Sequence, residues 1–234
     1  MAINSFTATS YPSCNDPLGT NITSYTMMGW WYFTSAGSSD QCLFSRGRID
    51  RDDSATYAYM SATRTLIFGE LSAGSLASAA ITSLVGSWYH VAFVRSEVSP
   101  RRQIFVNGVS VASQVSPAAY PGLHDRQFAT GVMLRATETS RRQCTYGTAF
   151  DSRVYARPVP VTEIAHIVAC RGKDNPTDAL IRWCIQDGPS GQSMTGRSVA
   201  DHSVNGNHGV VQGTDLVSAQ EPYGTVRAST RGLS

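Results

Sequence analysis

The most constraining feature of the chain is a set of three strand-like runs in its middle. Trp88–Arg95 (WYHVAFVR), Arg102–Val106 (RQIFV) and Val109–Val111 (VSV) are rich in β-branched and aromatic residues, and alternating side chains of such runs face opposite sides of a strand. Asn107 and Gly108 separate the last two runs. A type I′ turn needs positive φ at both central residues, which Asn-Gly supplies, so this segment predicts a β-meander.

The composition fits a sheet protein with many turns. Of 234 residues, 41% are hydrophobic and only 15% are charged, and the chain has 20 glycines and 10 prolines. A net charge of +2 favours neither nucleic acid nor an anionic membrane. No run approaches the length of a membrane span. We therefore expect neither nucleic acid nor a membrane among the partners.

Five pieces of the chain, in order, resemble the laminin-G-like, concanavalin A-like jelly rolls. The central meander resembles the core signature of that family, and four further segments agree with its order: Tyr25–Thr34 (YTMMGWWYFT), Gln41–Gly47 (QCLFSRG), Asp151–Arg157 (DSRVYAR) and Val161–Val168 (VTEIAHIV). The resemblance implies an all-β, concanavalin A-like jelly-roll sandwich of two antiparallel sheets with one short helix. Pro158 and Pro160 precede that helix, and Thr162 is the expected N-cap.

The family's opening motif stands near the end of this chain. Leu180–Gly188 (LIRWCIQDG) and Ala200–Gly213 (ADHSVNGNHGVVQG) resemble the first strand and turn of the family. Residues 178–234 are too few for a second jelly roll. A circular permutation is the alternative, because it is tolerated where the termini lie close together at the surface. We expect a single domain over residues 1–234, with strands at about 178–213 closing the sandwich beside the N-terminal strand.

The acidic residues lack the pattern of a glycosidase. Retaining glycosidases place two carboxylates about 5–5.5 Å apart across a cleft. Here the glutamates are isolated in sequence: Glu70, Glu97, Glu138, Glu163 and Glu221. No G-x-S-x-G elbow, P-loop or dinucleotide fingerprint is present. The sequence therefore predicts no enzyme and no catalytic residue, and a glycoside hydrolase is disfavoured.

Calcium is the one metal ion that the sequence supports, and its role would be structural. No other cofactor is expected. Some members of the family hold Ca²⁺ with loop carboxylates and carbonyls, the oxygen ligands that this ion prefers. Two sets of residues offer such ligands: Asp50, Asp52 and Asp53 in one loop, and Asp201, Asn205 and Asn207 in the late motif. The alternative for either set is that these side chains only shape turns.

A glycan site needs an exposed aromatic platform with polar neighbours. Tyr57 and Tyr59 stand close to the Asp52–Asp53 loop, and Tyr120 and His124 lie in a loop with two prolines. Either pair is a candidate for glycan binding. The alternative is that tyrosines on a half-buried strand are ordinary sheet composition.

The context of the chain suggests a virion. The first residues lack the basic and apolar regions of a signal peptide, and the five cysteines form no C-x-x-C pair. We expect a non-enzymatic phage virion protein, a capsid decoration or tail-associated protein made in the host cytoplasm. Its partners would be other capsid or tail proteins and copies of itself. The alternative is a lectin-like module that binds cell-surface carbohydrate for host recognition.

Overall fold

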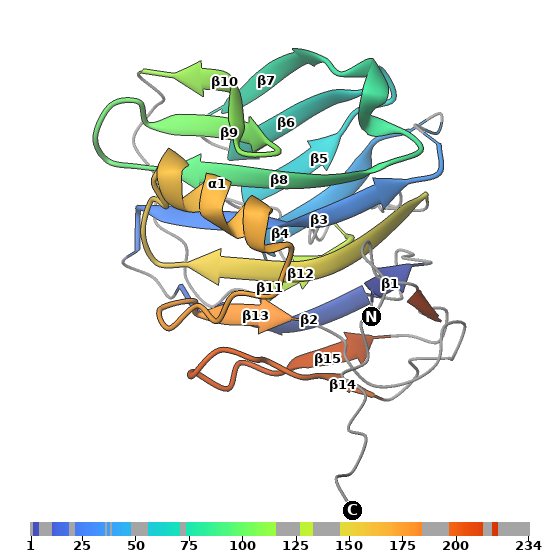
Figure 1. Ribbon diagram of the computed structural model, residues 1–234, viewed down its shortest axis with the longest axis vertical. Coiled ribbons are helices and arrows are strands. Elements are labelled where there is room, and N and C mark those ends of the chain that lie inside the picture. Colours follow the sequence, from blue (N-terminus) through green and yellow to red (C-terminus); the bar gives the residue numbers. More distant parts are fainter. Residues whose placement is uncertain are drawn as a thin grey trace, which may run out of the picture.

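The computed structural model describes residues 2–4, 11–18, 22–35, 37, 39–47, 56–70, 74–115, 127–132, 146–183, 197–212 and 217–219. Within these residues, two antiparallel sheets of eight strands each pack face to face (Figure 1). The all-β sandwich with one helix that the sequence predicts is confirmed.

The first sheet, sheet A, carries the helix on its outer face. Its strands follow the order β10, β9, β8, β3, β12, β1, β16, and β13 also pairs with β12. Their bounds are β1 (Ala2–Asn4), β3 (Tyr25–Phe33), β8 (Trp88–Arg95), β9 (Arg102–Val106), β10 (Val109–Gln114), β12 (Gly147–Tyr155), β13 (Ile181–Trp183) and β16 (Val217–Ala219).

The second sheet, sheet B, follows the order β14, β15, β2, β11, β4, β5, β6, β7. Its strands are β2 (Tyr11–Asn15), β4 (Gln41–Gly47), β5 (Thr56–Met60), β6 (Thr65–Glu70), β7 (Gly74–Ala80), β11 (Gln127–Thr130), β14 (Ser198–Val199) and β15 (Gly209–Gln212). A single 3₁₀ turn, η1 (Thr82–Leu84), leads from β7 toward β8.

The central meander forms as the sequence predicts. Asn107 and Gly108 have φ of 49° and 81°, the positive values that a type I′ turn requires. Strand β8 pairs with β9 on one side and with β3 on the other. Its alternation sends Val91 and Phe93 into the space between the sheets, whereas Ala92 on the opposite face packs in the cluster beneath the helix.

The main core lies between the two sheets and is rich in aromatic side chains. The Phe44 ring contacts Trp31 and Phe93 edge-on, with ring centroids 5.7 and 6.3 Å apart, and Phe128 joins them. Edge-to-face packing adds to the stabilisation that comes from burying the rings. These four side chains come from both sheets, so they hold the two layers together.

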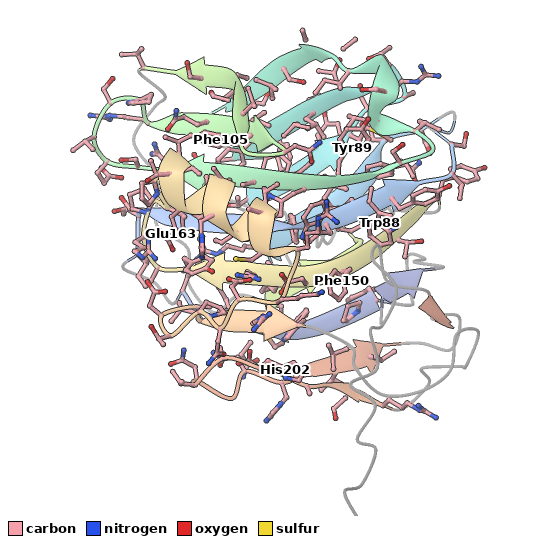
Figure 2. The ribbon with its side chains drawn as sticks, in the orientation of Figure 1. Trp88, Tyr89, Phe105, Phe150, Glu163 and His202 are labelled. Carbon is pink, nitrogen blue, oxygen red and sulfur yellow. The ribbon has the colours of Figure 1, made fainter. Side chains whose placement is uncertain are left out.

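Helix α1 (Val161–Cys170) covers part of the outer face of sheet A. Ile164 and Ile167 pack against sheet residues that include Met28 and Phe105. Trp88 and Phe150 lie to the right of the helix in Figure 2, where they join a smaller aromatic cluster with Trp30.

The start of the helix differs from the sequence prediction. The N-cap is Pro160, without a side-chain cap, and its carbonyl accepts the N–H groups of Glu163 and Ile164, both at 3.0 Å. The expected Thr162 cap is therefore wrong: Pro160 brings the chain in with an extended conformation, and Val161 already begins the first turn. At the other end, Arg171 and Gly172 take positive φ and close the helix.

Strands from both ends of the described chain meet in each sheet. In sheet A, β16 pairs with β1, and in sheet B, β15 pairs with β2. Strand β13 adds to β12 on the other side of sheet A from the meander. In the described residues, no helix has the length and hydropathy needed to cross a bilayer.

Candidate glycan-binding face

The outer face of sheet B carries two of the tyrosines that the sequence singles out. On β5, Ala58 and Met60 point into the core, so Tyr57 and Tyr59 take the opposite face. Their ring centroids are 5.9 Å apart and their planes are inclined by 34°. They form one small cluster with Cys42 and Ile67.

Tyr57 owes its position to a glycine on the neighbouring strand. Tyr57 and Gly69 are register partners, and a Cβ atom on Gly69 would lie 2.3 Å from Cε2 and 2.6 Å from the hydroxyl oxygen of Tyr57. Only a residue without a side chain leaves that space empty. The phenol ring therefore lies across the sheet above β6 rather than standing away from it.

The two tyrosines differ in exposure. Tyr59 is only 9% exposed, whereas Tyr57 is half-buried. Beyond Tyr57, the next strand presents small exposed side chains: Ser75 pairs with Gly69, and Ala77 pairs with Ile67. Tyr59 is therefore largely covered, and Tyr57 is the more exposed of the two rings.

The other glycan candidates and the first calcium set lie outside the described residues: Tyr120, His124, Asp50, Asp52 and Asp53.

Asp201 organises the late motif through four hydrogen bonds. Its Oδ1 accepts the backbone N–H of Arg182 at 2.8 Å and that of Ser203 at 2.9 Å. Its Oδ2 accepts the Ser203 hydroxyl at 2.6 Å and the Asn207 N–H at 2.7 Å. Asp201 is 8% exposed, so these bonds satisfy a carboxylate that is largely removed from water.

The two asparagines of the same motif attach the turn to the chain that leads into β13. The side-chain amides of Asn205 and Asn207 donate to the carbonyls of Ala179 and Leu180 at 2.8 and 2.7 Å. Trp183 donates its indole N–H to the Asn207 carbonyl at 3.0 Å. The structure thus brings together all three residues of the second calcium set, and it gives each a structural role.

A calcium ion bound by Asp201 would have to displace hydrogen bonds that this carboxylate already accepts. Both Asp201 oxygens accept two donors each, and the asparagines use their amide nitrogens. Among the described residues, no group of three or more His, Cys, Asp or Glu side chains is arranged to hold a metal ion.

A buried ionic cluster, which the sequence did not reveal, lies on sheet A. Arg153 is fully buried and bonds Asp151 and Asp174, each at 2.5 Å. Arg182 adds a second contact to Asp151 at 3.1 Å. Burial tends to raise the pKa of Asp174, but the hydrogen bonds from Arg153 hold it below its usual value.

His90 lies close to this cluster but is not a candidate base. It is fully buried against the Trp30 ring, with centroids 5.3 Å apart. Burial, aided by the charge of Arg153, lowers the pKa of His90 to about 3. The neutral, enclosed ring therefore has a structural role.

A second buried cluster joins the two sheets at one end of the sandwich. Glu70 of sheet B contacts Arg102 of sheet A, accepts the Tyr25 hydroxyl at 3.2 Å and lies 3.3 Å from Arg95. Glu70 is only 2% exposed. The Glu70 carboxylate thus links the two sheets, and its role is structural.

The comparisons with known proteins agree with this architecture. The family model described as the concanavalin A-like lectin/glucanases superfamily matches residues 6–165, which is more than half of the chain. The protein belongs to this superfamily. No curated protein matches the sequence of this superfamily member.

Two solved structures share the fold of this superfamily member. One is described as a "putative carbohydrate binding protein" from Bacteroides ovatus, with a TM-score of 0.68 and 17% identity over 94% of this chain; the chain spans 60% of the length of that protein. The other is a heptameric SAP-like pentraxin from Limulus polyphemus, with a TM-score of 0.58 and 15% identity, covering 95% of this chain and 90% of the pentraxin. At these identities the likeness is one of fold.

Proposed function

We propose that the protein is a carbohydrate-binding, lectin-like module that takes a glycan on the outer face of sheet B. The observation that carries the proposal is the Tyr57 ring laid across the sheet above Gly69. The family and the fold shared with a protein described as carbohydrate binding support it.

The chemistry of the face suits a sugar ring. One side of a pyranose presents C–H groups that pack on an aromatic surface, while its hydroxyls need hydrogen-bond partners. Tyr57 supplies the surface. The exposed Ser75 hydroxyl lies on the strand beyond it and offers both a donor and an acceptor.

The proposal is for binding without catalysis. Glu70 is the one glutamate that the structure describes on the strands of sheet B, and its oxygens are committed to Arg102 and Tyr25. A single shallow platform binds weakly, so several copies acting together would raise the avidity. Homo-oligomerisation would serve this function.

The test is a glycan array probed with the full chain and with three variants. Tyr57→Ala should lose binding, whereas Tyr57→Phe should keep most of it. Tyr32→Ala is the matched control, because Tyr32 is a half-buried tyrosine on the opposite outer face, packed against Trp88. Glycan binding that survives Tyr57→Ala would overturn the site.

The same protein preparation separates the lectin role from the virion role predicted from the sequence. The full chain is mixed with undecorated phage capsids in parallel with the array. A silent array with stoichiometric capsid binding would overturn the lectin proposal and support a decoration protein.

A further inference from the structure

We propose that His166 and Cys170 on helix α1 form a two-ligand binding site for a thiophilic divalent cation such as Zn²⁺. The two residues are one helical turn apart, so their side chains share a face of the helix. Cys170 Sγ lies 3.4 Å from His166 Nε2. His166 is exposed and Cys170 is half-buried, so water and ions reach the pair.

The distance between the two atoms fits a chelate. Zinc bonds to sulfur at about 2.3 Å and to imidazole nitrogen at about 2.0–2.1 Å, and at a tetrahedral angle the two ligand atoms then lie about 3.5 Å apart. The observed separation of 3.4 Å is close to that value, but Cys170 Sγ also lies 4.0 Å from His166 Nδ1, so the sulfur lies over the ring rather than along the Nε2 lone pair. The exposed imidazole has to turn about its side-chain bonds before both atoms face one ion, and this needs no change of backbone. Without a metal, the thiol proton can bridge the same two atoms as a weak hydrogen bond.

Binding is a simple exchange of cation for proton. The metal ion takes the place of the thiol proton, which is released to solvent, and the sulfur binds as thiolate while the imidazole stays neutral. Two protein ligands leave two tetrahedral positions for water. No oxidation or reduction is involved.

The position on the helix brings together opposed charges. Cys170 is the last residue of α1, whose last turn holds no basic residue, and the cationic Arg171 and Lys173 follow the helix end. The carbonyl groups at the C-terminus of a helix carry partial negative charge, which attracts positive ions. Thiolate and imidazole together select Zn²⁺, Co²⁺ and similar ions over Ca²⁺ and Mg²⁺, which prefer oxygen.

The test uses Co²⁺ as a coloured substitute for Zn²⁺. The untagged full chain, kept reduced by a thiol-free reductant, is titrated with Co²⁺ while the absorption of the cobalt–thiolate bond is followed. We expect one Co²⁺ per chain, displaced by Zn²⁺. Cys170→Ser should abolish the thiolate absorption, and His166→Ala should weaken Co²⁺ binding by about tenfold or more. Both side chains lie at the surface, and circular dichroism checks that the variants fold.

Matched controls come from the other thiols and histidines of the chain. Burial raises the pKa of Cys14 to about 12, so its thiol stays protonated and Cys14→Ser should leave the titration unchanged. His202→Ala removes an exposed histidine elsewhere and should also leave it unchanged. No thiolate absorption in the unaltered chain, or absorption that persists in Cys170→Ser, would overturn the proposal.

Discussion

Asp201 accepts the backbone N–H of Asn207 at 2.7 Å, and this bond closes the turn that docks on β13. The same carboxylate accepts the backbone N–H of Arg182 at 2.8 Å. One side chain therefore holds both sides of the contact between the late motif and sheet A.

Replacing Asp201 by alanine should destabilise the fold. The variant would leave the N–H groups of Arg182 and Asn207 without an acceptor in a nearly buried place, so we expect a loss of about 3 kcal/mol in the free energy of unfolding. Urea denaturation measures it. Asp201→Asn keeps one acceptor oxygen and should cost less; equal costs would contradict this account.

Calcium should leave the melting temperature unchanged if the hydrogen bonds are the whole role of Asp201. The four donors already use both carboxylate oxygens. Thermal melts of the intact protein in EDTA and in millimolar Ca²⁺ compare the two states. A rise in melting temperature with Ca²⁺ that Asp201→Asn abolishes would instead support the calcium site predicted from the sequence.

Gly69→Ala should impair glycan binding while leaving the protein folded. The new methyl group would occupy the place of the Tyr57 ring, 2.3 Å from Cε2, and the ring would have to turn away from the sheet. We expect binding weakened by about tenfold, or about 1.4 kcal/mol, measured by calorimetry with the best glycan of the array. Ala77→Ser, on the same face without a ring above it, is the control. Unchanged affinity in Gly69→Ala would exclude the flat ring as the platform.

His90 should make stability fall with acid. Its folded pKa of about 3 lies below the ordinary value of 6.5. Between these values the unfolded chain binds a proton that the folded chain does not, so stability decreases as pH is lowered from about 6.5 toward 3. The contribution of this one group approaches about 1.4 kcal/mol per pH unit.

The effect of His90 is separable from that of the carboxylates. His90→Gln should flatten the dependence of unfolding free energy on pH between about 6.5 and 5, above the range in which carboxylates titrate. Chemical denaturation at a series of pH values measures both slopes. Parallel slopes for the variant and the unaltered protein would refute the assignment.

Arg153→Met should be strongly destabilising. It leaves the buried Asp151 and the partly buried Asp174 without the cation that both contact at 2.5 Å, and breaking a buried pair typically costs about 3–5 kcal/mol. Arg157→Met is the matched control: Arg157 also bonds two carboxylates, Glu163 and Asp178, but is 36% exposed. Its loss should cost less than about 1 kcal/mol, and similar costs for the two arginines would contradict the difference in burial.

Local patterns were sufficient for much of the fold. The Asn107-Gly108 turn depends on the two residues themselves, which are among the few that adopt positive φ readily. The helix was predicted for the right segment, but its start was misplaced because Thr162 is a good cap in isolation and Pro160 took that position. Strand β7 consists of small residues without hydrophobic alternation, so its pattern does not predict a strand. The segment becomes a strand because it pairs with β6.

The candidate sites show the same division. The alternation on β5 places Tyr57 and Tyr59 on one face, which a sequence can indicate. Packing between strands decides the rest. It leaves the Tyr57 ring partly exposed above Gly69, and it covers Tyr59. The spacing of His166 and Cys170 is that of one helical turn, but only the helix in the structure brings the two side chains together.

The central meander was thus decided by short-range patterns, because backbone preferences and side-chain alternation act within a few residues. The order of strands within each sheet was not, because it pairs segments far apart in the chain, such as β3 with β12 and β2 with β15. The buried ion pairs were decided only by the tertiary structure. Arg102 and Glu70 are 32 residues apart, and Arg182 and Asp151 are 31 apart. Nothing in either local segment specifies its partner, because the cost of burying a charge is met only when the folded sheets bring the opposite charge to it.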